Sequence, residues 1–302
     1  MNTSTRESLL RTFRVAPGRP MRLKDHDPAW AGTAEMKKLG HEDLIDRARV
    51  HLEKTLDGLA DAQELLWASN THAVLIVFQA MDAAGKDGTI KHVMRGVNPQ
   101  GCRVHSFKRP STEELDHPFL WRQMKVVPPR GMITIFNRSH YEDVIVTRVH
   151  PELLGDRDIS PSQINKAFWA GRYDDINAFE RHLVRSGTVI LKFFLNVSKE
   201  EQRRRFLERL ENDDKHWKFS HADVAEREHW DEYMRVYELA LSATSTAHAP
   251  WFVIPADHKW ITRTLVAEIV TKSIKTLRLA FPTPSAAEKR ALVRARNKLK
   301  EE

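Results

Sequence analysis

Five short apolar segments, separated by stretches with helical spacing, constrain the fold of this chain more than any other feature. The strand candidates lie at 73–78, 103–107, 132–136, 188–195 and 251–254. Helical segments are expected at 41–69, 88–97, 111–125, 140–153, 174–186, 198–212, 222–243 and 257–280. Apolar strands that alternate with helices are typical of a parallel sheet buried on both faces. The pattern predicts an α/β fold with a doubly wound, parallel five-stranded sheet and helices on both sides.

The chain has 302 residues, enough for one large α/β domain with additions at its ends. Residues 1–40 are polar and interrupted by Pro17, Pro20 and Pro28, which predicts an arm that wraps over a surface. The main domain is expected to span 41–284. A basic tail at 285–302 completes the chain.

Composition excludes several classes of protein. A lone cysteine, Cys102, excludes an internal disulfide framework and a cysteine-rich zinc site. No window approaches the ~18 consecutive apolar residues of a membrane helix, and the N-terminus lacks the apolar core of a secretory signal. These features predict a soluble, cytoplasmic protein without membrane association.

The formal net charge of +7 raises the local concentration of anions around any basic cleft. Nucleic acid, anionic membrane and polyphosphate are all compatible with this charge. Much of the surplus lies in the tail at 289–300, so the global charge identifies no partner. Only local clusters of charged residues can identify the partner.

The stretch QAMDAAGKDGT at 79–89 follows the first apolar strand and resembles the phosphate-binding pattern G-x-x-x-x-G-K-[ST]. Ala80 replaces the first glycine and Asp87 replaces the hydroxyl residue, while Gly85 and Lys86 are in place. A strand, loop and helix in this order form an anion nest. The expected phosphate-binding residues are Ala84, Gly85, Lys86, Asp87, Gly88 and Thr89.

Asp82 is the unusual residue of this loop. A carboxylate aimed into a phosphate cradle repels the phosphate unless a cation lies between them, so Asp82 is interpreted as a Mg²⁺ ligand. The alternative is a surface turn before an ordinary helix, with Asp87 as a first-turn acid.

A second polar cluster follows the third strand at 137–143. Open α/β sheets place their chemistry at the carboxyl ends of strands. Arg138 is therefore expected to point toward the same crevice as Lys86, and Glu142 or Asp143 to turn back to the metal. The alternative is a helix start with two first-turn acids.

Two further clusters supply basic residues. Arg205 and Arg209 are four residues apart and share one helix face, which predicts a lid at about 203–225 that closes on the phosphates. A solvated basic face paired with neighbouring glutamates explains them equally well. Lys108 and Arg109, just past the second strand, either grip a phosphate or are ordinary loop charges.

Taken together, these stretches resemble the family 2 polyphosphate kinases over most of 40–280. The stretches that carry the resemblance are QAMDAAGKDGT at 79–89, SFKRP at 106–110, FNRSHYEDV at 136–144, DKHWKF at 214–219 and APWFVIPADHKW at 249–260. The resemblance implies a thymidylate-kinase-like P-loop core with a helical lid. It implies dependence on Mg²⁺, with Mn²⁺ as a substitute, and phosphoryl transfer between inorganic polyphosphate and nucleoside mono- or diphosphates. It also implies a homo-oligomer, a dimer or a tetramer, and no nucleic-acid partner.

Position by position, Asp82 resembles the family's metal-organising loop carboxylate and Lys86 its loop lysine. Arg138 resembles the arginine after the third strand, and Glu142 with Asp143 the acidic pair beside it. Family members restricted to diphosphates tend to carry aspartate at the position of Asn137. Asparagine here resembles the subgroup that accepts both mono- and diphosphates.

The expected mechanism is direct in-line transfer without a covalent intermediate. A phosphohistidine route through His92, His105 or His140 is the rival. An ATP-dependent nucleotide kinase shares the same core and lid. From another class, a non-catalytic protein could use the basic tail to bind nucleic acid.

Overall fold

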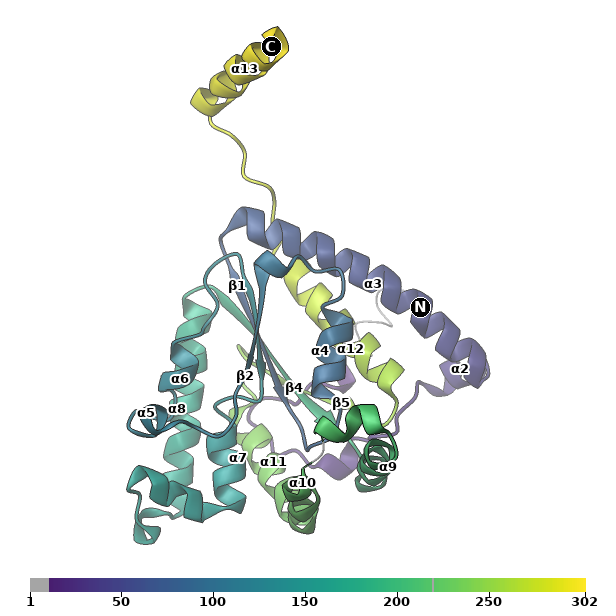
Figure 1. Ribbon diagram of the computed structural model, residues 1–302, viewed down its shortest axis with the longest axis vertical. Coiled ribbons are helices and arrows are strands. Elements are labelled where there is room, and N and C mark those ends of the chain that lie inside the picture. The colour runs from purple at the N-terminus through teal and green to yellow at the C-terminus, as the bar shows by residue number, and fades with distance from the viewer. Residues whose placement is uncertain (1–10, 219) are drawn as a thin grey trace.

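A computed structural model of the protein describes residues 11–218 and 220–302 (Figure 1). Residues 1–10 of the expected arm, and Phe219 of the expected lid and of the DKHWKF stretch, lie outside the described residues. The strands are β1 (Ala73–Gln79), β2 (Cys102–Ser106), β3 (Ile133–Asn137), β4 (Thr188–Asn196) and β5 (Trp251–Pro255).

The five strands form one parallel sheet in the order β2-β3-β1-β4-β5. Every residue of β1 is buried, as expected for a central strand covered on both faces. The predicted α/β class and parallel five-stranded sheet are confirmed. Because β1 lies between β3 and β4, the carboxyl ends of all three open onto one edge of the sheet.

Helices cover both faces of this sheet (Figure 1). On one face lie α3 (His41–Ser69), α4 (Lys86–Val93) and α12 (Lys259–Lys275). On the other lie α7 (Glu142–Val149), α8 (Lys166–Arg185) and α11 (Trp230–Thr244). The bounds of α3 match the expected 41–69, because its apolar residues repeat at helical spacing along its whole length.

Prolines divide two of the expected helices. The segment 111–125 forms α5 (Thr112–Leu115) and α6 (Trp121–Met124), with Pro118 between them. The segment 140–153 ends as α7 at Val149, two residues before Pro151, and continues as the 3-10 helix η3 (Pro151–Arg157). Proline lacks the N–H that would continue the helix and disfavours helical geometry in the residue before it.

Other helix ends differ where a cap or a turn intervenes. α4 stops at Val93, shortly before Gly96, whose φ is +88°. α8 starts at Lys166 rather than near 174, because the Asn165 side chain accepts from the N–H groups of Ala167 and Phe168.

The region around the expected lid consists of short pieces. It contains α9 (Lys199–Leu210), η5 (Asp213–Lys218), α10 (His221–Ala225) and η6 (Glu226–His229), so the expected helix 222–243 is divided before α11. The remaining short helices are η1 (Leu23–Asp25), α2 (Ala34–Lys37), η2 (Pro99–Gly101) and η4 (Pro161–Gln163).

The described part of the N-terminal arm, residues 11–40, packs against the outer strand of the sheet. Val15 N–H donates to Trp251 O at 2.9 Å, and Val253 N–H donates to Phe13 O at 2.8 Å. Phe13 and Val15 are buried and belong to the hydrophobic core. The arm therefore covers the otherwise open edge of β5 and contributes to the core.

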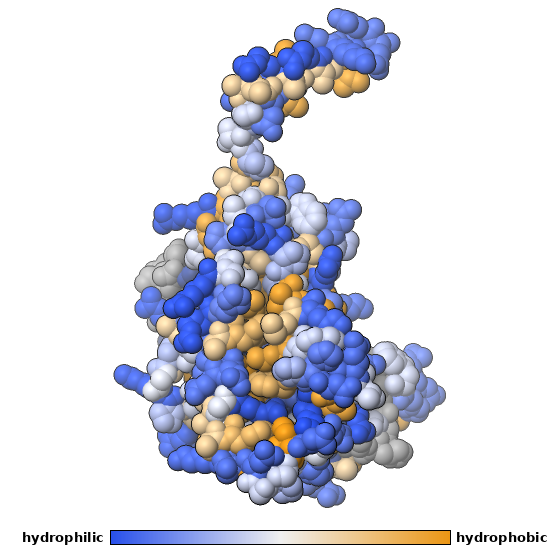
Figure 2. Space-filling model, turned by 90° about the vertical axis from the view of Figure 1, so that its left-hand side faces the viewer, coloured by the Kyte–Doolittle hydropathy of each residue, from blue (hydrophilic) through white to orange (hydrophobic). Residues whose placement is uncertain are grey.

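At the other end, α13 (Ala286–Glu301) stands apart from the body after an extended link (Figure 1). Its residues are all exposed. Figure 2 shows the face at the left of Figure 1, where apolar side chains gather in a hollow surrounded by polar ones. Among residues 11–218 and 220–302, the structure has no helix that is both long and apolar enough to cross a membrane.

Candidate functional site

The loop between β1 and α4 is shaped by two left-handed residues. Gly85 has a φ of +103° and Ala83 a φ of +59°. Glycine adopts such angles without strain, whereas alanine does so only when its surroundings enforce them. The loop turns the chain from β1 into the N-terminus of α4, where helix N–H groups and the helix dipole favour an anion.

Lys86 is the first residue of α4, and its side chain folds back along the loop. Its Nζ donates to Ala80 O at 2.8 Å and to Met81 O at 3.3 Å. Burial lowers the pKa of Lys86, and the neighbouring Asp82 carboxylate opposes this shift. A desolvated ammonium with backbone acceptors alone gains from a phosphate that arrives beside it.

Residues after β3 meet this loop across the sheet edge. Asn137 Nδ2 donates to Asp87 Oδ1 at 2.7 Å. Arg138 Nη2 donates to Asp82 Oδ1 at 2.8 Å, and Arg138 Nη1 lies 3.7 Å from Glu142 Oε2. Arg138 also has a left-handed φ of +63°, at the point where the chain leaves β3. The predicted convergence of these residues on one crevice is present in the structure.

The electrostatics of this group are strongly coupled. The Glu142 carboxylate, followed by that of Asp82, raises the pKa of Arg138. Burial raises the pKa of Glu142 even though Arg138 and Lys86 oppose it. Two cations and two carboxylates thus share a small, partly desolvated region, an arrangement typical of sites that handle charged substrates.

These residues line a cleft of about 960 Å³. The sequence-predicted residues that line it are Asp82, Ala84, Gly85, Lys86, Asp87, Gly88, Thr89, Lys108, Arg109, Asn137, Arg138, Arg205 and Arg209. Glu142 reaches the group through Arg138. The structure therefore brings together all the predicted site residues except Asp143.

Asp143 lies away from the cleft. Its carboxylate is buried, with Oδ1 at 3.5 Å from Arg157 Nη2 and 3.8 Å from Arg172 Nη1. Adjacent residues at the start of a helix point in different directions, so Glu142 faces the loop and Asp143 faces α8. The expectation that Asp143 turns to the metal is not met, and we leave it out of the proposed site.

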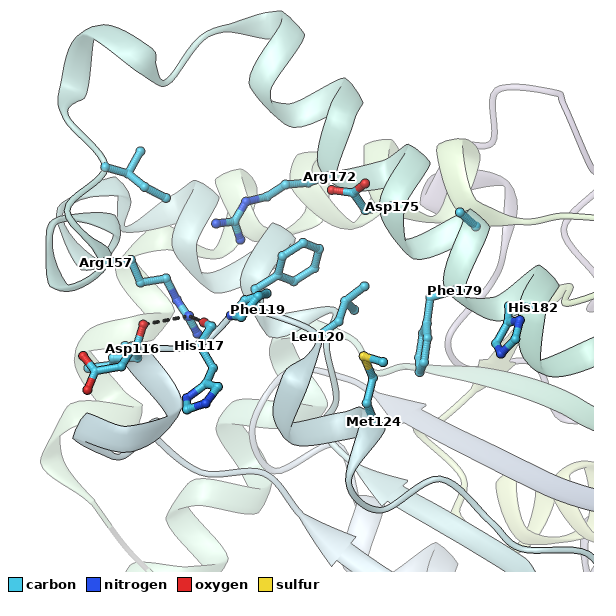
Figure 3. Close-up of a pocket in the computed structure, with 14 residues that line it drawn as sticks. Asp116, His117, Phe119, Leu120, Met124, Arg157, Arg172, Asp175, Phe179 and His182 are labelled. Carbon is cyan, nitrogen blue, oxygen red and sulfur yellow. Dashed lines mark hydrogen bonds between the residues drawn. The ribbon is translucent and has the colours of Figure 1, made fainter.

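Arg157 and Arg172 also line a second cavity of about 730 Å³, between the α5–α6 segment and α8 (Figure 3). Arg157 Nη1 donates to His117 O at 2.8 Å, and the Arg172 guanidinium lies 4.6 Å from the Phe119 ring centroid. Asp143 thus helps to anchor the segment that follows β2. This cavity does not share a lining residue with the cleft.

Arg205 takes a different role from the one expected. Its side chain is 5% exposed and bonds to the backbone of the loop and of the residues after β5. Arg209, one turn further along α9, remains in the cleft lining. Spacing alone places both residues on one helix face but does not reveal that the first is buried.

Sequence reasoning missed three residues that line the cleft from the first turns of α12, namely Lys259, Thr262 and Arg263. Trp217, in the quoted stretch at 214–219, lines it as well. Lys259 belongs to the quoted stretch at 249–260, so a signal for it was available. Burial lowers the pKa of both Lys259 and Arg263.

The histidines of the rival route are poorly placed. His140 is fully buried behind β3, and His92 Nδ1 lies 2.7 Å from Gly88 O. None of His92, His105 and His140 lines the cleft.

The donor set of the site fits a metal that arrives with phosphate. Within residues 11–218 and 220–302 there is no group of three or more His, Cys, Asp or Glu that could hold a metal alone. Mg²⁺ usually takes one or two carboxylates and completes its shell with water and substrate phosphate oxygens. Asp82 and Glu142, both bound to Arg138, are two such carboxylates at the mouth of the loop.

The sheet order, the loop between β1 and α4, and the convergent lysine, arginine and carboxylates define a P-loop phosphotransferase. The sequence model of the polyphosphate kinase 2 family matches residues 45–282. On this match the chain belongs to the polyphosphate kinase 2 family, as the sequence predicts.

Individual relatives agree with this assignment. The chain is 46% identical over 288 residues to an ADP-polyphosphate phosphotransferase of Rhodopseudomonas palustris, with 95% of this chain and 97% of the relative covered. It is 43% identical over 284 residues to an AMP/ADP-polyphosphate phosphotransferase of Meiothermus ruber, with 94% and 100% covered. The crystal structure of polyphosphate kinase 2 from Arthrobacter aurescens superposes with a TM-score of 0.81 at 38% identity, over 93% of this chain and 95% of that one. The protein is therefore an enzyme, and these matches favour a polyphosphate kinase over an ATP-dependent nucleotide kinase or a non-catalytic nucleic-acid-binding protein.

Proposed function

We propose that this enzyme transfers the terminal phosphoryl group of inorganic polyphosphate to the phosphate of a nucleoside mono- or diphosphate, and that it also runs in reverse. The observation that best supports this proposal is a single cleft that is lined by Lys86, Arg138 and a further set of cations. That set is Lys108, Arg209, Lys259 and Arg263. In the part of the chain that the structure describes, none of these four has an ion pair. A linear polyanion needs such a row of charges and no base pocket.

In the proposed reaction, a phosphate oxygen of the acceptor attacks the terminal phosphorus of the donor in line. The new P–O bond forms as the bridging P–O bond to the next donor phosphate breaks, and the bonding electrons remain on the shortened chain. The acceptor oxygen is already ionised near neutral pH, so no strong general base is required. Lys86 and Arg138 stabilise the charge on the transferred group, and the loop N–H groups orient it.

Asp82 and Glu142 would hold Mg²⁺, or Mn²⁺ in its place, and the bound cation would neutralise negative charge on the phosphates. Asp82 has the additional role of holding Arg138, to which it is bonded at 2.8 Å. Glu142 supports the same arginine from the other side.

The assay that tests this function measures ADP and ATP formation with polyphosphate as the sole phosphoryl donor. AMP and ADP are offered separately, with Mg²⁺ present. We expect both acceptors to be phosphorylated. The same assay with ATP as donor and AMP as acceptor separates the proposal from an ATP-dependent kinase: transfer from ATP without transfer from polyphosphate would overturn it.

Use of both acceptors is the finer part of the proposal, and Asn137 supports it. Its amide donates to Asp87, and both residues line the cleft; an ionised carboxylate at this position cannot make that bond. We expect Asn137→Asp to lower the ratio of kcat/KM for AMP to that for ADP by about 10-fold. An unchanged ratio would remove Asn137 from the specificity of this site.

We further propose that the enzyme acts in the cytoplasm, where nucleotides are available, and as a dimer or tetramer. Light scattering coupled to gel filtration measures the assembly directly. A monomeric mass with full activity would contradict the oligomer.

A further inference from the structure

The carbonyl groups of three consecutive loop residues bond to the same neighbouring helix. Asp82 O accepts from Gln202 Nε2 at 2.8 Å. Ala83 O and Ala84 O accept from Arg205 Nη1 at 3.1 and 2.8 Å. Both donors lie on α9, about 120 residues away along the chain. The outer side of the phosphate loop is thus fixed by side chains of one helix.

Arg205 uses all of its hydrogen-bond donors within the protein. Besides the two loop carbonyls, its Nη2 donates to Ala256 O and Asp257 O at 2.5 and 3.2 Å. Its Nε donates to Glu201 Oε1 at 2.7 Å. A guanidinium has five N–H groups, and each has an acceptor here. Arg205 therefore has no donor left for a phosphate, although it borders the cleft.

The orientation of these carbonyls determines where the loop N–H groups point. In a planar trans peptide, the C=O of one residue and the N–H of the next point in opposite directions. Because Asp82 O and Ala84 O face α9, the N–H groups of Ala83 and Gly85 face away from it, toward the cleft side. Bonds on the outside of the loop thus present donors to an anion on the inside.

The backbone of the loop needs this support. Ala83 has a left-handed φ of +59°, which costs a non-glycine residue about 1 kcal/mol or more. Its own carbonyl is one of the two that bond to Arg205. The helix bonds therefore oppose a local tendency of the loop to relax.

α9 is itself held in place on two sides. Ser198, the N-cap of α9, donates its N–H to Asp257 Oδ1 at 2.8 Å. Gln202 Oε1 accepts from Arg227, which follows the expected lid in η6 and also donates to Lys199 O at 3.2 Å. The segment that carries Arg209 and Trp217 is consequently attached at its start to Asp257, after β5, and at its end to α9 itself.

We propose that Gln202 and Arg205 are positioning residues. They keep the phosphate loop in the shape that binds an anion, so that phosphoryl transfer depends on α9 although neither side chain touches the substrate. The proposal rests on the proposed function only for the choice of donor in the kinetic assay.

The test compares three variants. Gln202→Met keeps the length of the side chain but removes both its donor to the loop and its acceptor for Arg227. Arg205→Lys keeps the charge but cannot reach four carbonyls. Arg203→Ala is the matched control, because Arg203 lies on the same helix with its side chain 62% exposed and pairs with Glu200, another exposed residue. The loop itself is followed by the amide hydrogen exchange of peptides that cover 80–88.

We expect Gln202→Met and Arg205→Lys each to lower kcat by about 10-fold or more, with the KM for the nucleotide changed by less than about 3-fold. Exchange in 80–88 should accelerate, and the affinity for inorganic triphosphate, measured by calorimetry, should fall by about 10-fold. Both variants should also lose some thermal stability, because buried carbonyls lose their donors, so all kinetic and exchange measurements are made well below the melting temperature of each variant. Arg203→Ala should change none of these quantities.

Other outcomes would overturn the proposal. If loop exchange stays at the wild-type rate while kcat falls, the two residues act on the reaction in some way other than by shaping the loop. If both stay at wild-type values, they have no positioning role. Wild-type protein that cannot use polyphosphate would sink the proposed function alone, because the exchange and triphosphate measurements do not depend on that assay.

Discussion

Lys86 combines two properties that suit a group for phosphoryl transfer. It is the first residue of α4, beside the helix N-terminus, and its ammonium is desolvated and bonded to the carbonyls of Ala80 and Met81. A preorganised cation in such surroundings stabilises developing negative charge without having to reorganise first. The two carbonyls hold it at the loop until a phosphate arrives.

We expect Lys86→Ala to lower kcat by about 100-fold or more, because the charge on the transferred group loses its nearest cation. Steady-state kinetics with polyphosphate and ADP measure the effect. Lys91→Ala, an exposed lysine of the same helix, is the control and should retain wild-type turnover. Near-normal turnover of Lys86→Ala would exclude Lys86 from the chemistry.

Glu201 lies on α9, the helix whose side chains bond to the phosphate loop, and it makes the stability of the fold depend on pH in the acidic range. Its hydrogen bonds, first to Arg204 and then to Arg205, lower its pKa from 4.5 to about 2. A depressed carboxylate pKa stabilises the fold above the unfolded pKa, and this contribution is lost as the pH falls through the folded pKa. The relevant window therefore runs from 4.5 down to about 2.

We expect Glu201→Gln to lower the free energy of unfolding by about 1–2 kcal/mol at neutral pH, a value reduced from the full shift because Arg204 is largely exposed. The deficit should shrink progressively below about pH 4.5. Urea titrations of both proteins at several pH values measure it. A deficit that is constant across this range would mean that the carboxylate charge is not its cause.

At the scale of elements, the short buried strands and the loop that follows the first of them were predictable, because both depend on local pattern. Alternation of apolar strands with helices fixes a parallel sheet, and the pattern at 79–89 fixes an anion nest after β1. Helix interruptions at Pro118 and Pro151 follow from local chemistry too. Continuous helices were expected at 111–125 and 140–153 because Pro118 and Pro151 were not taken into account.

The roles of Asp143 and Arg205 were not predictable, because they depend on which neighbour packs against each helix face. Sequence spacing places Glu142 and Asp143 in the same first turn. Only the packing of α7 against α8 shows that Asp143 faces Arg157 and Arg172. Likewise, the burial of Arg205 depends on strand ends that are far away in sequence.

The two acidic residues Asp82 and Asp143 should therefore behave differently when they are replaced. Asp143→Ala leaves two buried arginines without their carboxylate, so we expect a loss of about 3 kcal/mol of stability and a turnover per folded molecule that stays within about 5-fold of the wild type. Asp82→Asn removes a charge at the cleft, so we expect turnover to fall by about 100-fold with little change in stability.

Urea unfolding and steady-state kinetics on both variants test this contrast. Asp61→Ala, which alters an exposed acid of α3, controls for the loss of one negative charge. Asp143→Ala with full stability and a 100-fold slower reaction would return Asp143 to the catalytic group.

At the scale of the whole molecule, the body and the basic tail are structurally separate. The sheet, its helices and the described part of the arm share one hydrophobic core. α13 contributes no buried residue and stands away from that core (Figure 1). Its segment, 285–302, carries six Lys or Arg against three Glu. The tail can therefore act on a polyanion electrostatically but cannot hold the cleft together.

We expect deletion of 285–302 to leave the melting temperature within about 2 °C of the wild type and to leave kcat with a short polyphosphate within about 2-fold. With a long polyphosphate at low ionic strength, KM should rise by about 3-fold, because the tail's charges no longer attract the donor. This difference should vanish at about 0.5 M salt, where charges more than a few ångströms apart are screened. A full-length variant with Lys289, Lys298 and Lys300 changed to Gln separates charge from helix and should reproduce the KM effect. If the deletion instead abolishes turnover with both donors, the tail completes the cleft or the assembly, and the separation of body and tail is wrong.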